Sequence, residues 1–434
     1  MPSARTRHRI FHGLAAMLAA ATLVAPGPGA AQAKPAFEPA PTLAGSELAP
    51  ASLLKGPLHT VAEPVHLDGY FGRFVIESKF GSFTVLGVNM LGVRVNELQA
   101  IEALQQVQQS QAFQDALARS AAAPVRFAQS AVTNPVQTVE NVGQGLGTVL
   151  GRIGFLAQSG IQSVADASAD RSNPPPPSQA APPPDGESVP TGFMGDPFGF
   201  NRARREWAKS LNVDPYTTNP VLRPLLDQVA AASFAGSFAV NTALGAVSMP
   251  ANLVVEFDTT VRDQVWNQPA SDLARQNEAT LLGLGVAGRT TRDFLRNRWF
   301  TPSLQTALVT ALAKFGAVDG MEAVIRVASE MQGETRARFL IESVRMLAQY
   351  HAREARITKL RMSNLVPVAV AADGTLVAAA AVDYVYWDRN TAEFAQRPDL
   401  KAKRRVLLVA GTASPAAQQA FAKAGLALRT GGRP

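Results

Sequence analysis

Apolar and polar residues alternate with two different periods along the chain, and the first is typical of strands. Between residues 61 and 86, β-prone runs are separated by Asp68-Gly69 and then by Gly81. Asp-Gly is a strong hairpin signal because both turn positions need a positive φ. The pattern therefore predicts an N-terminal three-stranded β-meander.

Beyond the meander the apolar spacing becomes helical. Leu98, Ile101 and Leu104 recur every three residues in a stretch rich in Gln, Glu and Ala. Thr301-Pro302 predicts another helix start, with threonine as N-cap and proline at the first helical position. The remaining predicted helices cover residues 111–120, 124–132, 136–170, 198–211, 221–247, 253–265, 271–282, 321–331 and 334–350. The middle of the chain is thus expected to be a central helical core.

Near the C-terminus the pattern returns to strands. Asp373-Gly374 lies between two β-prone runs and predicts a second hairpin. Ser414-Pro415 opens a short helix that Gly425 ends. Apolar runs at residues 405–410 and 426–428 flank this helix, and a strand–helix–strand of this length predicts parallel strands.

The predicted fold class is α+β, predominantly helical, with a β-hairpin and a strand–helix–strand unit at the C-terminus. Two proline runs between residues 171 and 192 favour extended polyproline II and predict a spacer. The predicted organisation is a signal peptide (1–33), a weakly ordered lead-in (34–56), the meander with helices (57–170), a proline-rich linker (171–192), a helical domain (193–352) and a small α/β unit (353–434).

The first 33 residues have the three parts of a secretory signal. Three arginines precede an apolar run at residues 14–25, which is too short to span a bilayer as a helix. Pro26-Gly27 breaks that run, and Ala31-Gln32-Ala33 is a small-x-small cleavage site. We expect cleavage near Ala33 and a periplasmic or secreted mature chain; an uncleaved membrane anchor is the alternative.

Composition excludes several classes of site. The 434 residues include no cysteine, which rules out disulfides, zinc ribbons and cysteine nucleophiles. Removing the three signal arginines leaves 38 Lys and Arg against 34 Asp and Glu, a net charge of +4. Short basic clusters occur at residues 202–205, 289–298 and 401–405. We interpret them as solvated faces of the protein; the alternative is that they attract an anionic membrane surface or polymer. They do not indicate a nucleic-acid partner.

Small residues recur at four-residue spacing on two predicted helices. One carries Gly143, Gly147 and Gly151; the other carries Ala231, Ala235, Ala239 and Ala243. Such stripes let two helix backbones approach closely, in a soluble fold or in a membrane. Polar residues and Pro250 on the second helix favour soluble packing over contact with lipid.

No cofactor or metal site is expected. The segment from Gly283 to Gly288 matches the dinucleotide fingerprint in letters, but a polar helical stretch precedes it instead of a buried strand. After cleavage three histidines remain, His59, His66 and His351, which are too few and too scattered to predict a zinc site.

Candidate catalytic groups are equally weak. Ser414 could be a nucleophile between a strand and a helix, but an N-cap is the simpler interpretation. Glu77, Asp383 and Asp388 lie near aromatic residues, as in carbohydrate sites and in ordinary half-exposed strands. The phrases Asn212-Val213-Asp214-Pro215-Tyr216 and Val382-Asp383-Tyr384 resemble motifs, with no chemistry attached.

Three functions follow from these patterns. The first is a non-enzymatic binding or scaffolding module of the cell envelope, with an envelope protein or polymer as partner. The second is a membrane-associated helical protein that uses small-residue helix packing. The third is a hydrolase acting on an envelope polymer through carboxylates that the sequence does not place.

Overall fold

The computed structural model describes residues 37–121, 197–234 and 257–432. Of these, 53% lie in helices and 19% in strands. The strands form several separate sheets. The predicted mixture of helices and sheets is therefore confirmed.

The N-terminal sheet contains the predicted meander. It is formed by β4 (Val65–Asp68), β5 (Phe71–Ser78) and β6 (Gly81–Leu86), all antiparallel. Gly69 has a φ of 60°, as the expected turn requires. Three short strands complete this sheet: β1 (Thr42–Leu43), β2 (Lys55–Gly56) and β3 (His59–Val61).

The lead-in expected to be weakly ordered has regular structure from Thr42 onward. Besides β1 and β2 it holds two one-turn helices, α1 (Gly45–Leu48) and α2 (Ala51–Leu54). The carboxylate of Glu63 accepts a hydrogen bond from the amide of Gly45 at 2.9 Å, and Leu48 and Leu53 are buried. These contacts are made by residues outside the segment, so its own composition does not reveal them.

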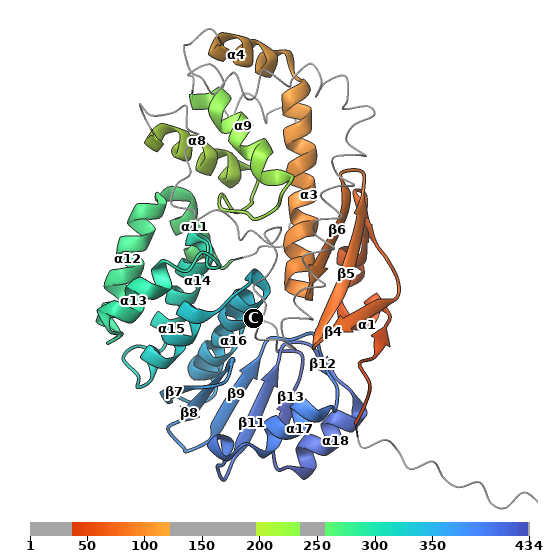
Figure 1. The fold of residues 1–434 in the computed structure, drawn as a ribbon, viewed down its shortest axis with the longest axis vertical. Helices are drawn as coiled ribbons and strands as arrows, with labels where there is room; N and C mark the ends of the chain where they lie inside the picture. The colour runs from red at the N-terminus through yellow and green to blue at the C-terminus, as the bar shows by residue number, and fades with distance from the viewer. Residues whose placement is uncertain (1–36, 122–196, 235–256, 433–434) are drawn as a thin grey trace, which may run out of the picture. The chain divides into compact units, whose positions relative to one another are not determined.

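Among the described residues, four helices follow the N-terminal sheet: α3 (Val88–Gln109), α4 (Gln111–Ala121), α8 (Pro197–Ser210) and α9 (Leu222–Phe234). The start of α3 packs against β5 and β6, and further along it packs against α9 (Figure 1). The buried residues of α3, α9 and the sheet form one hydrophobic core.

Six more helices build a second core: α11 (Thr259–Asn267), α12 (Ala270–Gly283), α13 (Gly288–Leu295), α14 (Pro302–Ala313), α15 (Met321–Glu330) and α16 (Glu334–Arg353). As predicted, α14 begins with Thr301 as N-cap, whose hydroxyl accepts from the amide of Leu304 at 3.4 Å. None of the described helices is long and apolar enough to cross a membrane.

The C-terminal sheet has the strand order β13-β11-β9-β8-β7 (Figure 1). The turn expected at Asp373-Gly374 joins β8 to β9 in antiparallel pairing, and β11 runs parallel to β9 and β13. The elements are β7 (Ile357–Ser363), β8 (Val366–Ala371), β9 (Leu376–Ala380), β10 (Tyr384–Val385), α17 (Arg389–Gln396), η2 (Pro398–Leu400), β11 (Arg405–Val409), β12 (Thr412–Ala413), α18 (Pro415–Lys423) and β13 (Ala427–Arg429).

Asp383 connects the two ends of the described chain. Its carboxylate accepts from the amide of Gly72 in β5 at 2.9 Å and from that of Val88, the first residue of α3, at 3.1 Å. Its own amide donates to the carbonyl of Tyr70 at 3.1 Å. Asp383 therefore supplies the N-terminal cap that Gly87, which has no side chain, does not provide.

Candidate functional site

The loop between α8 and α9 places several polar side chains in the protein interior. Asn212 near its start has a φ of 54°, a left-handed conformation that asparagine tolerates. At its end the side chain of Asn219 accepts from the amides of Val221 at 2.9 Å and Leu222 at 3.1 Å. These bonds satisfy free amides at the start of α9 and fix the loop between the two helices.

Glu97 of α3 is the first buried acid that meets this loop. Its carboxylate pairs with Arg94 one turn earlier, with Nη1 2.6 Å from Oε2. It also accepts from the Thr217 hydroxyl and from the Asn219 amide nitrogen, the latter at 2.9 Å. Only 2% of Glu97 is exposed, so these partners take the place of water.

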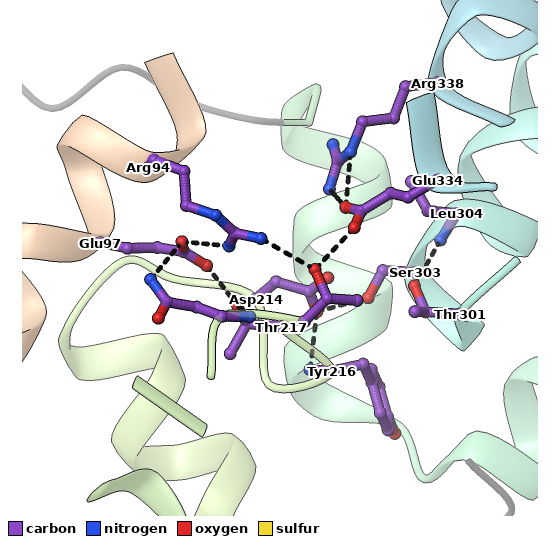
Figure 2. Close-up of polar contacts among 12 residues, drawn as sticks. Arg94, Glu97, Asp214, Tyr216, Thr217, Thr301, Ser303, Leu304, Glu334 and Arg338 are labelled. Atoms are coloured by element: carbon purple, nitrogen blue, oxygen red, sulfur yellow. Dashed lines mark hydrogen bonds and ion pairs between the residues drawn. The ribbon is translucent and has the colours of Figure 1, made fainter. Parts of the chain in front are cut away.

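A second ion pair lies on α16, across the loop from the first (Figure 2). Arg338 donates from Nε to Oε1 of Glu334 at 2.8 Å. The Thr218 hydroxyl donates to Oε2 of Glu334 at 2.6 Å and accepts from Nη2 of Arg94 at 3.1 Å. Thr218 thus bridges the two pairs, and α3, the loop and α16 share one hydrogen-bonded network.

Asp214 is the third buried acid. Its Oδ1 accepts from the Ser303 hydroxyl at 2.5 Å and from the Tyr216 amide at 2.9 Å. Burial raises the pKa of Asp214 to about 6, although both hydrogen bonds and the charge of Arg338 act in the opposite direction. Asp214 therefore takes up a proton under mildly acidic conditions.

Opposite charges keep Glu334 and Arg94 in their charged forms at neutral pH. Burial alone would raise the pKa of Glu334, but Arg338 and Arg94 outweigh it and hold that pKa below its ordinary value. Burial alone would lower the pKa of Arg94, but Glu97 and Glu334 outweigh it and hold that pKa above its ordinary value.

We name this set the buried polar cluster; it comprises Arg94, Glu97, Asp214, Thr217, Thr218, Asn219, Ser303, Glu334 and Arg338. A general acid or a nucleophile must reach its substrate. Both oxygens of Glu97 and both oxygens of Glu334 are instead bound by side chains of the cluster. The arrangement joins helices that are distant in sequence, and all four carboxylate oxygens of Glu97 and Glu334 take part in these contacts.

An open pocket of about 510 Å³ lies elsewhere, at the amino ends of β9, β11 and β13. Its lining is strongly basic. Four cationic side chains and one carboxylate face it, together with the ring of Tyr350 from the end of α16: Lys403, Arg404, Arg405, Arg429 and Asp373. We name it the basic pocket.

The small-residue stripes fall mostly outside the described residues. This applies to Gly143, Gly147 and Gly151, and to Ala235, Ala239 and Ala243. Ala231 is in α9, where it is partly buried against Phe200 and Ala203 of α8. The packing of one stripe on the other remains a prediction.

Ser414 is the N-cap of α18, as the simpler interpretation held. Its hydroxyl accepts from the amide of Ala417 at 3.0 Å and donates to the carboxylate of Glu38 at 2.5 Å. The glycine-rich segment is likewise structural. Gly283 ends α12 and Gly288 begins α13, so no strand precedes the turn as a dinucleotide site requires.

The three histidines have separate structural contacts. Nε2 of His59 lies 3.1 Å from the carbonyl of Leu53, Nδ1 of His66 lies 3.0 Å from the Thr42 hydroxyl, and His351 accepts from an amide. Within the described ranges, no group of three His, Asp or Glu side chains could hold a metal ion.

The acids near aromatic residues also have structural partners. Asp388 accepts from the Tyr70 hydroxyl at 2.9 Å and caps α17, and Glu77 accepts from Ser82 at 3.1 Å. Asp383 caps α3 as described above.

Sequence reasoning missed the role of Glu97, Arg94, Glu334 and Arg338. A signal was present, because Arg94 and Glu97 stand three residues apart in an otherwise apolar helix start, and such a pair can be buried only if both charges are bound. The Asn212–Tyr216 phrase marked the loop that binds them. Comparison with protein-family models, with curated proteins and with solved structures finds no match for this chain.

Proposed function

We propose that this chain is an exported protein of the cell envelope that acts by binding and not by catalysis. The observation that carries the proposal is the basic pocket, where cations outnumber the single carboxylate Asp373 by four to one. Such a lining suits recognition of an anionic partner, since unlike charges attract at short range. The signal-like first 33 residues supply the reason to place it in the periplasm or outside the cell.

Export is tested by expressing the full chain in a Gram-negative host and sequencing the N-terminus of the recovered protein. We expect a mature chain that begins at Lys34 in the periplasmic or extracellular fraction. Replacing Ala31 and Ala33 by leucine should block cleavage, since signal peptidase needs small residues there. An unprocessed wild-type chain in the cytosol would remove the proposal.

A hydrolase would need two carboxylates that face each other across a cleft. Asp373 is the only acid lining the basic pocket, and Arg404 pairs with it. In the buried polar cluster, Glu97 and Glu334 are bound by Arg, Thr and Asn side chains, and Oδ1 of Asp214 accepts from the Ser303 hydroxyl and the Tyr216 amide. These contacts favour the binding role over the hydrolytic one.

Membrane association is the second candidate, and one surface favours it. Arg289, Arg292 and Arg296 are exposed on or next to α13, and Leu282 beside them is 47% exposed. Exposed arginines next to an apolar side chain suit an anionic membrane surface. Washing membrane fractions with 0.5 M salt and then with carbonate tests this candidate. A chain bound by electrostatic attraction is released by the salt wash, and a chain embedded in the membrane is released by neither wash.

A further inference from the structure

Two cations of the basic pocket are paired, and both pairs lie at the surface. Arg404 is paired with Asp373, and Arg429 lies 2.5 Å from Glu354. About half of each arginine side chain or more is exposed, at 64% and 51%. Exposed pairs of this kind are weak, so a ligand can compete for these arginines.

The other two cations have no carboxylate partner among the residues that the structure describes. Arg405 donates to the carbonyls of Ala395, at 3.0 Å, and of Ala424, which follows the last turn of α18. The guanidinium is therefore held in place, and the partial negative charges at the C-terminal ends of α17 and α18 offset part of its charge. Lys403 is exposed and makes no ion pair within the same ranges.

The pocket is larger than a single inorganic anion needs. Its volume of about 510 Å³ lies within the range of small-molecule sites, roughly 300–1,000 Å³. Val406 and Leu426 contribute apolar lining, and Tyr350 contributes a phenol. Burial and the nearby carboxylates of Glu354 and Asp373 raise the pKa of Tyr350, so its hydroxyl keeps its proton and can donate.

We propose that the basic pocket binds a small organic dianion, with a phosphate monoester as the expected group. Two cations without a carboxylate partner among the described residues, Lys403 and Arg405, match the charge of about −2 that a phosphate monoester carries at neutral pH. Arg404 and Arg429 at the rim supply planar donors suited to phosphate or carboxylate oxygens. The inference rests on the binding role proposed above and names the ligand class of the same pocket.

Isothermal titration of the mature chain with glucose 6-phosphate, glucose and succinate tests the ligand class. We expect glucose 6-phosphate to bind with a Kd below about 1 mM and glucose not to bind. If succinate binds with a similar Kd, the result supports a site for dianions and shows that a dicarboxylate can supply the two negative charges as well as a phosphate monoester. Absence of binding by both dianions overturns the proposal.

Matched variants then locate the site. Lys403→Gln should weaken dianion binding about fivefold, the most that one exposed ion pair contributes, and added Arg429→Gln should weaken it further. Lys401→Gln is the control, because Lys401 is equally exposed two residues away but does not line the pocket. Equal weakening by Lys401→Gln would show diffuse attraction instead of a site. Because export is measured in a separate experiment, the proposal of an exported protein can be supported even if the proposal of dianion binding is overturned.

Discussion

Buried charged side chains make several of the contacts that join segments distant in the sequence. Arg94 and Glu97 each lose water on folding; each is stabilised by the other, Glu97 also by Thr217 and Asn219, and Arg94 also by Thr218 and Glu334. A buried pair of this kind adds little net stability, but loss of one partner leaves an uncompensated charge inside the protein. Substitution of these few side chains is therefore expected to reduce the stability of the fold more than substitution of most others.

Glu97→Gln should lower the free energy of unfolding by about 3–5 kcal/mol, because Arg94 would lose the one carboxylate that it pairs with directly and would keep only the more distant charge of Glu334. Guanidinium denaturation followed by tryptophan fluorescence measures the change. Glu102→Gln, on the same helix but paired with Lys79 nearer the surface, should change it by less than about 1 kcal/mol. Equal effects of the two variants would contradict the role of the cluster.

Asp214 predicts a pH dependence of stability. Its pKa is about 6 in the folded chain and 3.8 when exposed, so the folded state binds more protons between these values. The stability contributed by the protonated form is complete below pH 4 and is lost as the pH rises through 6. The loss of stability between these pH values is on the order of 1–3 kcal/mol. Asp214→Asn keeps an oxygen that can accept from Ser303 and Tyr216 but does not titrate, so this pH-dependent loss should be absent in the variant. Parallel pH profiles for the two proteins would refute the assignment.

At the scale of elements, the sequence predicts what local patterns encode. The Asp-Gly turns, the Thr301 cap and the Ser414 cap depend on neighbouring residues, and all are present. β7 was not predicted, because only Ile357, Leu360 and Ser363 of it are buried and they do not alternate. The buried polar cluster was missed for a related reason, since its partners lie more than a hundred residues apart.

The cap on α3 is an element-scale feature that can be tested. Asp383→Ala would leave the amides of Gly72 and Val88 buried without an acceptor, at a cost of about 2–4 kcal/mol. Hydrogen exchange at these two amides should accelerate along with the loss of stability. Asp293→Ala is the control, because its carboxylate is half exposed and only weakly paired, and it should change little.

Close packing around the same residue predicts a second effect. A Cβ on Gly411 would clash with the backbone carbonyl of Asp383, whereas a Cβ on Gly283 would meet nothing within 4 Å. Gly411→Ala should therefore cost at least about 2 kcal/mol, since the backbone must move. Gly283→Ala, near the end of α12, should be neutral or slightly stabilising. The melting temperatures of the two variants, compared with that of the wild type, test this prediction.

Across the whole described chain, several hydrophobic cores are connected by polar contacts. One core involves the N-terminal sheet with α3 and α9, another the later helices with one set of side chains of the C-terminal sheet, and a third the alternate side chains of that sheet. The buried polar cluster joins α3 to α16, and Asp383 joins α3 to the C-terminal part. These polar contacts act alongside apolar ones, since Tyr70 and Phe71 pack against the C-terminal core and Tyr384 packs against the N-terminal core.

We expect unfolding of the wild-type chain to give coincident transitions by far-ultraviolet circular dichroism and by tryptophan fluorescence. In the double variant Glu97→Gln/Asp383→Ala the two probes should separate, because the contacts of Glu97 with the loop before α9 and of Asp383 with the start of α3 would be weakened or lost. Coincident transitions in the double variant would mean that the cores are coupled by other contacts.

The position of Asp383 also has a consequence for the order in which the molecule is made. The carboxylate that completes the start of α3 is encoded 295 residues after the amide it binds. At about 5–20 residues per second, a ribosome needs roughly 15–60 s to cover that interval. During this time the first turn of α3 lacks its acceptor, so the start of this helix is completed only after the C-terminal part of the chain has been made.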